Sequence, residues 1–256
     1  MQKYLSVQSE DRVTTISIQR PPLNIINLEL IEELIDAINS ARFQQDCKVL
    51  VLRSKLDNVF SAGADVKEHL PDQADMLISK FEKLISEIIA FPRPTIGVVN
   101  GKCLGGGMEL ALACDFVLAD KNAVFGQPEV SVGVFPPIAT AIYWRLTGVR
   151  NTAKIVLTGR SFSAAEALLM GLVSYVANDE KELERIFQEL VGDFKSKSTV
   201  VLEFAKRAMR DSLSLSLEGA LSNSSRLYLN ELMKTTDSVE GLTAFIEKRK
   251  PAWSDK

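Results

Sequence analysis

Two patterns of hydrophobic and polar residues follow one another along most of the chain. Runs that alternate with a period of two, or that are short and continuously apolar, predict β-strands, whereas apolar residues three or four positions apart predict amphipathic helices. The predicted strands are residues 5–8, 13–19, 49–52, 95–99, 116–119, 123–125 and 172–176. The predicted helices among them are residues 28–42, 74–90, 138–146, 150–157 and 164–170. Strand pairs that alternate with helices indicate a layered α/β fold.

Short polar segments predict how neighbouring elements are joined. Residues 10–12 and 120–122 each separate two strand-like runs, so each is expected to connect a strand pair. Ser163 and Glu166 have the spacing of a capping box, which predicts that a helix begins at Ala164 and ends before Gly171.

The pattern changes in the C-terminal part of the chain. Beyond residue 178 the sequence is helical throughout, and its apolar stripes fall on residues 199–210, 217–233 and 238–248. The change predicts a boundary near residue 198, which separates a core of residues 1–197 from a helical segment of residues 198–256. Helices with exposed apolar stripes are expected to pack on another surface.

Composition narrows the class of protein. The chain has 256 residues, of which 46% are hydrophobic and 25% charged, so it is long and apolar enough to bury a sizeable core. A net charge of −3 argues against nucleic-acid binding through bulk electrostatics. No apolar run approaches the ~18 residues of a membrane span, and no apolar leader precedes the first strand, so we expect a cytoplasmic protein with no membrane partner.

The cysteines and the single histidine exclude several kinds of chemistry. Cys47, Cys103 and Cys114 are odd in number and lack C-x-x-C spacing, which favours a reducing compartment and argues against a disulfide scaffold or a metal site. A serine or cysteine hydrolase needs a histidine beside its nucleophile, but only His69 is present and no G-x-S-x-G turn occurs. His69 is interpreted as a loop residue, with a role in a pocket left open.

Nucleotide-binding loops are also absent. Residues 97–103 resemble a phosphate loop, but the glycines are too close together and Cys103 stands where a serine or threonine should hold magnesium. No G-x-G-x-x-G occurs, so no nicotinamide or flavin cofactor is expected.

The main chemical signal is a run of glycines between a predicted strand and a short apolar helix. Gly105, Gly106 and Gly107 stand where the helix begins, so its unpaired backbone N–H groups can face an anion, and Glu109 follows within the first turn. Such a run can be only a tight turn, and such a glutamate only a helix cap. Two similar turns at Gly63 and Gly126 also follow strands, so we expect all three to converge on one pocket.

These three turns give the chain a family resemblance. Residues 60–68, 105–109 and 126–129, in this order and at this spacing, together with residues 245–250, resemble the enoyl-CoA hydratase/isomerase (crotonase) superfamily. The resemblance implies an α/β, crotonase-like spiral of repeated ββα units with a helical C-terminal segment. It also implies an acyl-CoA thioester substrate, with coenzyme A as part of the substrate and no separate cofactor, and a homotrimer or a homohexamer built as a dimer of trimers.

The resemblance also assigns roles to residues. It implies that Ala64 and Gly106 supply the backbone N–H groups of an oxyanion hole and that Glu109 and Glu129 are the catalytic carboxylates. Two glutamates favour a hydratase over an isomerase or a catalytically silent acyl-CoA-binding protein, although which glutamate is the acid stays open. The remaining binding residues implied are Ala62, Gly105, Lys67 and Lys248, the two lysines for the nucleotide part of coenzyme A.

One segment departs from the usual pattern of the family. Pro137 stands where a glycine is expected, directly after Phe135 and Pro136, and as a first helical residue it still allows a helix to start. With residues 20–25, this segment resembles hydratases that act on cyclohexa-1,5-diene-1-carbonyl-CoA in anaerobic aromatic degradation. A flat ring could stack on Phe135 and Pro137. The alternative is a short-chain 2-enoyl-CoA hydratase of fatty-acid β-oxidation with a neutral turn variant.

Overall fold

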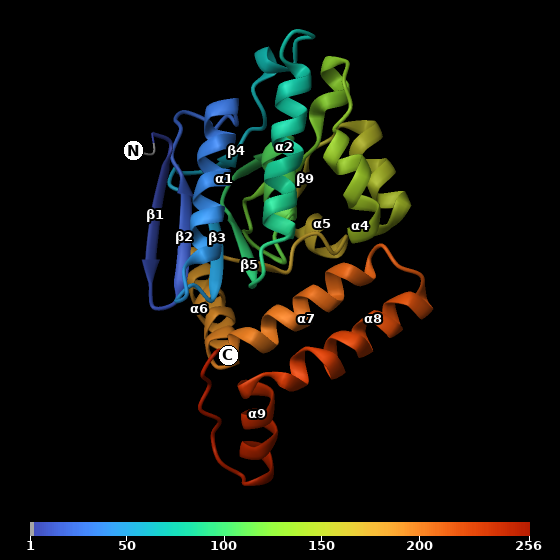
Figure 1. Ribbon diagram of the computed structural model, residues 1–256. Coiled ribbons are helices and arrows are strands. Elements are labelled where there is room, and N and C mark those ends of the chain that lie inside the picture. The colour runs from blue at the N-terminus through green and yellow to red at the C-terminus, as the bar shows by residue number, and fades with distance from the viewer. Residues whose placement is uncertain (1–2) are drawn as a thin grey trace. The chain divides into compact units, whose positions relative to one another are not determined.

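The computed structural model describes residues 3–256, and its chain forms two compact units (Figure 1). The first unit contains the chain up to residue 91 and residues 95–188, and the second contains residues 92–94 and 189–256. The division falls within helix α6 (Glu180–Lys195), and the boundary predicted at residue 198 lies after this helix.

A six-stranded sheet forms one layer of the first unit. Its strand order is β1 (Leu5–Glu10), β2 (Val13–Ile18), β3 (Val49–Ser54), β5 (Thr95–Val99), β7 (Phe116–Asp120) and β10 (Tyr175–Ala177). The hairpin of β1 and β2 is antiparallel, as predicted, and every other pair in this sheet is parallel. The central strands β3 and β5 have apolar residues on both faces and are almost wholly buried, which explains their continuous apolar runs.

A second, four-stranded sheet consists of very short strands. It has the order β4 (Val59–Ser61), β6 (Lys102–Leu104), β8 (Val124–Gly126) and β9 (Phe162–Ser163). From β3 to α4, each passage of the chain therefore adds one strand to each sheet and then a helix, and with β1, β2 and α1 before them these passages form the predicted spiral of ββα units. The pairing predicted for residues 116–119 with 123–125 is wrong, because Asp120 caps a turn that leads the chain from one sheet to the other.

Amphipathic helices cover the sheets. Helices α1 (Leu28–Phe43) and α2 (Ala74–Ile89) lie side by side (Figure 1) and bury the apolar stripes that predicted them. Helix α4 (Pro137–Thr158) is interrupted at Gly148, where φ is +77°, so the two predicted helices correspond to its halves. The capping box of α5 (Ala164–Leu169) is confirmed: the Ser163 hydroxyl accepts from the Glu166 N–H, and the Glu166 carboxylate accepts from the Ser163 N–H.

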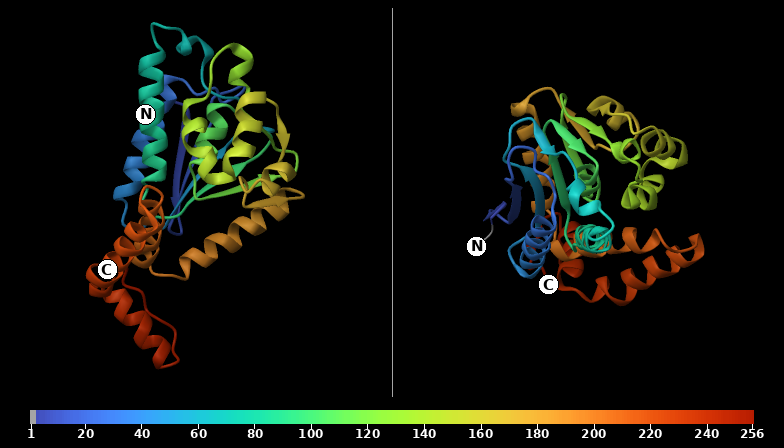
Figure 2. Two further views of the ribbon diagram at one scale, coloured as in Figure 1. Left: turned by 90° about the vertical axis from the view of Figure 1, so that its right-hand side faces the viewer. Right: turned by 90° about the horizontal axis from the view of Figure 1, so that it is seen from above.

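Three short helical elements follow the strands of the four-stranded sheet and carry candidate site residues. Helix α3 (Gly106–Leu112) is entirely buried, and the 3₁₀ helices η1 (Val66–His69) and η2 (Pro128–Val132) follow β4 and β8. Figure 2 shows this part of the unit, coloured green, from two further sides. The glycine turns thus open at the ends of β4, β6 and β8, which are neighbours in one sheet.

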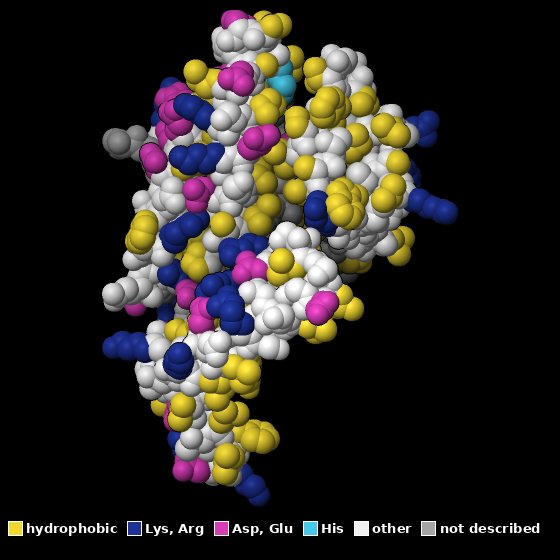
Figure 3. Space-filling model, turned by 45° about the vertical axis from the view of Figure 1, so that its right-hand side comes forward, with side chains coloured by type: hydrophobic (Ala, Val, Ile, Leu, Met, Phe, Trp, Pro, Cys, Tyr) yellow, Lys and Arg dark blue, Asp and Glu magenta, His cyan; other side chains and the backbone are white. Residues whose placement is uncertain are grey.

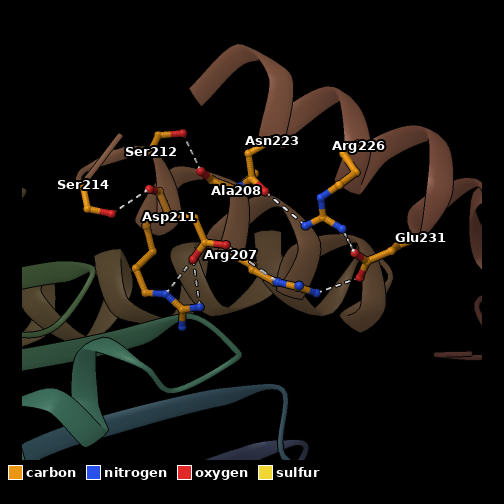
Figure 4. Close-up of polar contacts among 9 residues, drawn as sticks. Arg207, Ala208, Asp211, Ser212, Ser214, Asn223, Arg226 and Glu231 are labelled. Carbon is orange, nitrogen blue, oxygen red and sulfur yellow. Dashed lines mark hydrogen bonds and ion pairs between the residues drawn. The ribbon is translucent and has the colours of Figure 1, made fainter. Parts of the chain in front are cut away.

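The second unit is helical. It contains the end of α6, helices α7 (Thr199–Ser212) and α8 (Leu217–Asn230), the 3₁₀ helix η3 (Leu232–Lys234) and α9 (Thr236–Ile246). Arg207 on α7 bonds Glu231 at 2.8 Å and lies 3.8 Å from Asp211, so it joins α7 to the end of α8 (Figure 4). Large apolar side chains are exposed on this unit, among them Met209, Leu217, Leu229, Phe245 and Ile246.

No helix within residues 3–256 is both long and apolar enough to cross a membrane.

Candidate active site

The three glycine turns border one cavity of about 360 Å³ in the first unit. The structure brings together most of the predicted site residues in its wall, namely Ala62, Ala64, Gly105, Gly106, Glu109, Glu129, Phe135 and Pro137. Hydrophobic side chains and a histidine border a furrow in the upper part of Figure 3. The three turns therefore lie around one cavity, as predicted.

The turn after β4 approaches the start of α3 closely. A methyl group added to Gly106 would lie 3.3 Å from the Ala64 nitrogen and 3.2 Å from the Phe81 ring, so the two backbone segments are in van der Waals range. Gly63 makes the turn possible with a φ of +110°. Its carbonyl accepts from Ile26, and the Asp65 N–H donates to Ile26, so the intervening Ala64 N–H faces away from this bridge.

Two backbone donors thus lie side by side at the cavity wall. Among residues 3–256, neither the Ala64 N–H nor the Gly106 N–H donates to a protein acceptor. Gly106 is the first residue of α3, where the N–H groups have no partner within the helix and the helix dipole favours negative charge. The pair is suited to bind an oxygen atom that gains negative charge.

Glu109 lies deeper in the same wall. It is one turn into α3, its side chain is almost fully buried, and its Oε1 accepts a hydrogen bond from the Ala139 N–H at 2.8 Å. Burial, with a smaller contribution from the charge of Glu129, raises the pKa of Glu109 to about 8 against the opposing effect of the Ala139 hydrogen bond. Glu109 therefore holds a proton in conditions where an exposed glutamate has lost it.

Glu129 lines the same cavity from η2 and is only half-buried. Its Oε1 lies 2.6 Å from the position that a β-carbon on Gly105 would take, so only glycine leaves room for the carboxylate there. Burial raises the pKa of Glu129, whereas a backbone hydrogen bond and the charge of His69 lower it. The two carboxyl groups consequently share one cavity but differ in burial and in hydrogen bonding.

His69 and the two lysines have different places. His69 lines the cavity, and its Nδ1 lies 2.9 Å from the Asp65 carbonyl oxygen, so this nitrogen carries the proton and donates it. Lys67 is exposed on η1 and is not part of the cavity wall. Lys248 belongs to the second unit and is exposed.

Sequence reasoning missed part of the apolar wall. Leu77, Ile78 and Phe81 of α2 line the cavity, as do Val132 and Val134. The helical stripe that predicted α2 assigns Leu77 and Phe81 to the core, and nothing in the stripe separates a core residue from one that faces a cavity. Within residues 3–256, no group of three or more His, Cys, Asp or Glu side chains is placed to hold a metal ion.

Comparisons with known proteins agree with this geometry. Residues 8–256 match the enoyl-CoA hydratase/isomerase family. Cyclohexa-1,5-dienecarbonyl-CoA hydratase of Thauera aromatica is 33% identical over 251 residues, which cover 98% of this chain and 96% of that protein. The 2,3-dehydroadipyl-CoA hydratase of Escherichia coli (strain K12) is 35% identical over 250 residues, 96% and 97% of the two chains. The crystal structure of an enoyl-CoA hydratase from Bacillus anthracis matches with a TM-score of 0.93 at 31% identity, over 99% of this chain and 100% of that one.

Proposed function

The chain belongs to the enoyl-CoA hydratase/isomerase family, and we propose that it adds water reversibly to the double bond of an α,β-unsaturated acyl-CoA thioester. Its relatives named as hydratases are hydro-lyases, and this chain is an enzyme of that type. The observation that supports the reaction best is the presence of two carboxyl groups, Glu109 and Glu129, in one cavity with the free N–H groups of Ala64 and Gly106.

The backbone donors would stabilise the charge that forms on the thioester. When the oxygen of water attacks Cβ, the electrons of the double bond move toward the carbonyl, and its oxygen becomes an enolate. Ala64 and Gly106 present two N–H groups to that oxygen in an apolar cavity. Loss of one such donor lowers the rate by about 10²–10³ in enzymes that use them.

The glutamates would move the two protons. One carboxylate takes a proton from the attacking water, and the other, which is protonated, gives a proton to Cα, so that H and OH add across the double bond. The pKa of Glu109, raised by burial to about 8, keeps a proton on the pair at neutral pH. An isomerase or a silent binding protein has no need of a second carboxyl group in this position, so hydration is favoured.

We propose a cyclic dienoyl-CoA, cyclohexa-1,5-diene-1-carbonyl-CoA, as the substrate, and with it a role in anaerobic aromatic degradation. Phe135, Pro136 and Pro137 all line the cavity and offer flat apolar surfaces to a ring. The Thauera aromatica relative acts on the same compound by its name. The second candidate is a linear 2-enoyl-CoA of short chain, because a relative from Clostridium acetobutylicum that is named short-chain-enoyl-CoA hydratase is 31% identical to this chain.

The proposal extends to the residues that bind the thioester and the coenzyme A part of the substrate, and to the association of several copies of the chain. Ala62 and Gly105 border the thioester, and the exposed Lys67 and Lys248 offer ammonium groups to the phosphates of coenzyme A. The exposed apolar side chains of the second unit support association with further copies of the chain, and the family resemblance implies a trimer or a dimer of trimers.

An absorbance assay on a small panel of enoyl-CoA thioesters tests the reaction and the substrate together. We expect turnover of both the cyclic dienoyl thioester and crotonyl-CoA, with the larger kcat/KM for the cyclic compound. A tenfold preference for crotonyl-CoA, about 1.4 kcal/mol in transition-state binding, would reject the cyclic substrate and leave hydration intact. No turnover of any thioester in the panel would reject the proposed reaction.

A further inference from the structure

A buried tyrosine lies behind Glu129 and has no part in the mechanism described so far. Tyr143 on α4 is completely buried, and its hydroxyl lies 2.7 Å from the side-chain amide of Gln127, which is also completely buried. A phenol placed among apolar residues usually needs such a partner, and a buried amide needs partners at both ends. The other end of the Gln127 amide is therefore expected to have a polar partner as well.

The second end of the amide faces Glu129. With its nitrogen on that side, Gln127 lies 3.2 Å from both carboxylate oxygens of Glu129 and 3.2 Å from the carbonyl oxygen of Gly105, while its amide oxygen accepts from the Tyr143 hydroxyl. The opposite orientation would place the amide oxygen against those three acceptors. The orientation with the nitrogen toward Glu129 gives every atom of the group a partner.

The direction of the hydrogen bonds follows from the chemistry of the groups. Burial raises the pKa of Tyr143 well above its ordinary value, and the charges of Glu109, Cys103 and Glu129 act in the same direction, so the phenol keeps its proton. It donates to Gln127, and Gln127 donates to Glu129. A rotation of the amide by about 180° would place its nitrogen against the Tyr143 donor and its oxygen against the carboxylate of Glu129.

Helix α4 reaches both carboxyl groups from one face. Ala139 donates to Glu109, and Tyr143, four residues and one helical turn later, is bonded to the residue that donates to Glu129. Both contacts belong to the first two turns of the same helix, which starts at Pro137. The spacing between the two carboxyl groups is therefore set in part by one rigid element.

We propose that Tyr143 is a positioning residue, which fixes the orientation of the Gln127 amide so that Gln127 holds the Glu129 carboxylate over Gly105. The inference rests on the proposed hydratase function. Without the phenolic hydroxyl, the Gln127 amide oxygen loses its buried donor, so the amide is held only at its nitrogen end and Glu129 loses a donor fixed in position. Since a donor to a carboxylate favours the charged form, the pKa of Glu129 then rises.

Tyr143→Phe tests the inference, because it removes one hydroxyl and keeps the ring. We expect kcat to fall by about tenfold, because Glu129 is held less precisely, with the Kd of a saturated acyl-CoA changed less than threefold. The acidic limb of the pH profile of kcat moves to higher pH. Tyr175→Phe is the matched control, since this tyrosine lies on β10 with its side chain exposed, and it should leave all three quantities unchanged.

A second variant covers the case in which Tyr143→Phe fails to fold. Gln127→Met keeps the volume and removes the donor, so it should lower kcat and shift the same limb. Where both single variants fold, the double variant should lose little more than either one, because the two residues act on Glu129 in series. Losses that multiply in the double variant would overturn the proposal.

A measurement independent of turnover separates this inference from the proposed reaction. The ¹³C-carboxyl resonance of Glu129, assigned by comparison with Glu129→Gln, reports its pKa directly, and Tyr143→Phe should raise that pKa. If no thioester is hydrated but this shift occurs, the reaction is wrong and the positioning role stands. If hydration occurs and a folded Tyr143→Phe keeps kcat, the pH profile and the Glu129 titration within twofold of the parent, the positioning role is wrong.

Discussion

Glu109 and Ala139 are joined by a hydrogen bond of 2.8 Å, in which the backbone N–H of Ala139 donates to the carboxyl oxygen Oε1. Neither Pro136 nor Pro137 has an N–H, so Ile138 and Ala139 supply the first donors of α4. Thr140 already bonds to the Pro136 carbonyl within the helix. The Glu109 carboxyl group thus occupies the N-terminus of α4, where the helix dipole partly offsets the cost of its burial.

The helix dipole does not offset the whole cost of burying a charged Glu109 carboxylate, and this remaining cost makes stability depend on pH. The pKa of Glu109 is about 8 in the folded chain and near the ordinary 4.5 when unfolded, so between these values the folded state binds more protons. Stability therefore falls as pH rises through this window. Glu109→Gln should remove the fall and increase the free energy of unfolding at pH 9 by roughly 2–4 kcal/mol, with little change at pH 5.

Urea unfolding at both pH values measures this effect. Glu10→Gln serves as the control, because Glu10 is exposed at the end of β1 and should leave the difference between the two pH values unaltered. An equal gain at pH 5 and pH 9 would mean that packing, and not the ionisation of Glu109, limits stability.

Glu109→Gln and Glu129→Gln should each lower kcat for hydration by several orders of magnitude. Glutamine keeps the shape of the side chain and can accept from Ala139, but it cannot transfer a proton. The Kd of a saturated acyl-CoA should stay within about tenfold of the parent value, measured by calorimetry. A kcat within tenfold of the parent for either variant would refute the mechanism with two glutamates.

Gly106→Pro should abolish turnover, because proline removes the N–H assigned to the oxyanion hole while suiting the first position of α3. The added carbon would lie 3.2 Å from the Phe81 ring and 3.3 Å from the Ala64 nitrogen, so crowding alone could lower the rate. Gly106→Ala adds the same carbon and keeps the N–H. We expect it to retain about 10²–10³ times more activity than the proline variant, which is the usual loss for one donor.

Circular dichroism must first show that both variants are folded. Gly192→Ala provides the baseline for a glycine replaced in a helix, since a methyl group there meets no neighbouring atom within 4 Å. Equal activities of the alanine and proline variants would place the oxyanion hole elsewhere.

The fold and the position of the site could be predicted largely from the sequence, because both depend on local signals. The apolar stripe of α1, the capping box at Ser163 and the glycine turns at Gly63 and Gly105 each act over a few residues. That β7 and β8 belong to different sheets could not be predicted. Two adjacent strand-like runs joined by a short turn have the same sequence pattern whether they pair with each other or enter two sheets. The three-residue strands β4 and β6 are too short to show a period.

Side-chain networks were the other part that the sequence did not reveal. Gln127 belongs to the motif that identified the site, and Tyr143 belongs to a helix predicted from its stripe, but the contact between them depends on where α4 crosses η2. Hydrophobic spacing places Tyr143 in the core and gives no information about its hydroxyl. The same holds for Asp237 in the second unit, which looks like an ordinary acidic residue in the first turn of a helix.

Asp237 should be essential for the stability of the second unit. Its buried carboxylate accepts from the backbone N–H of Ser254 at 2.7 Å, from the Ser254 hydroxyl at 2.8 Å and from the Asp255 N–H at 2.9 Å. Asp237→Ala leaves these donors without their acceptor and should lower the free energy of unfolding by about 3 kcal/mol. Asp193→Ala, on the exposed side of α6, is the control. Similar losses of unfolding free energy in the two variants would show that the hydrogen bonds of Asp237 to Ser254 and Asp255 contribute nothing specific to stability.

Phe135 should determine the preference for a ring. Its side chain is 62% exposed although it lines the cavity, so a ligand can cover a face that is now in contact with water. Aromatic pairs gain about 0.5–1.5 kcal/mol beyond the burial of their area, and we expect the unsaturated face of a dienoyl ring to gain part of this on Phe135, whereas a linear crotonyl chain gains less from the same surface. Phe135→Ala should therefore lower kcat/KM for the cyclic dienoyl thioester by about tenfold or more and that for crotonyl-CoA by less than about threefold. Phe43→Ala, which removes an equally large ring that is 84% exposed at the end of α1, should change neither value. If Phe135→Ala lowers both values by the same factor, Phe135 is only part of the general apolar wall, and the cyclic substrate loses its main structural support.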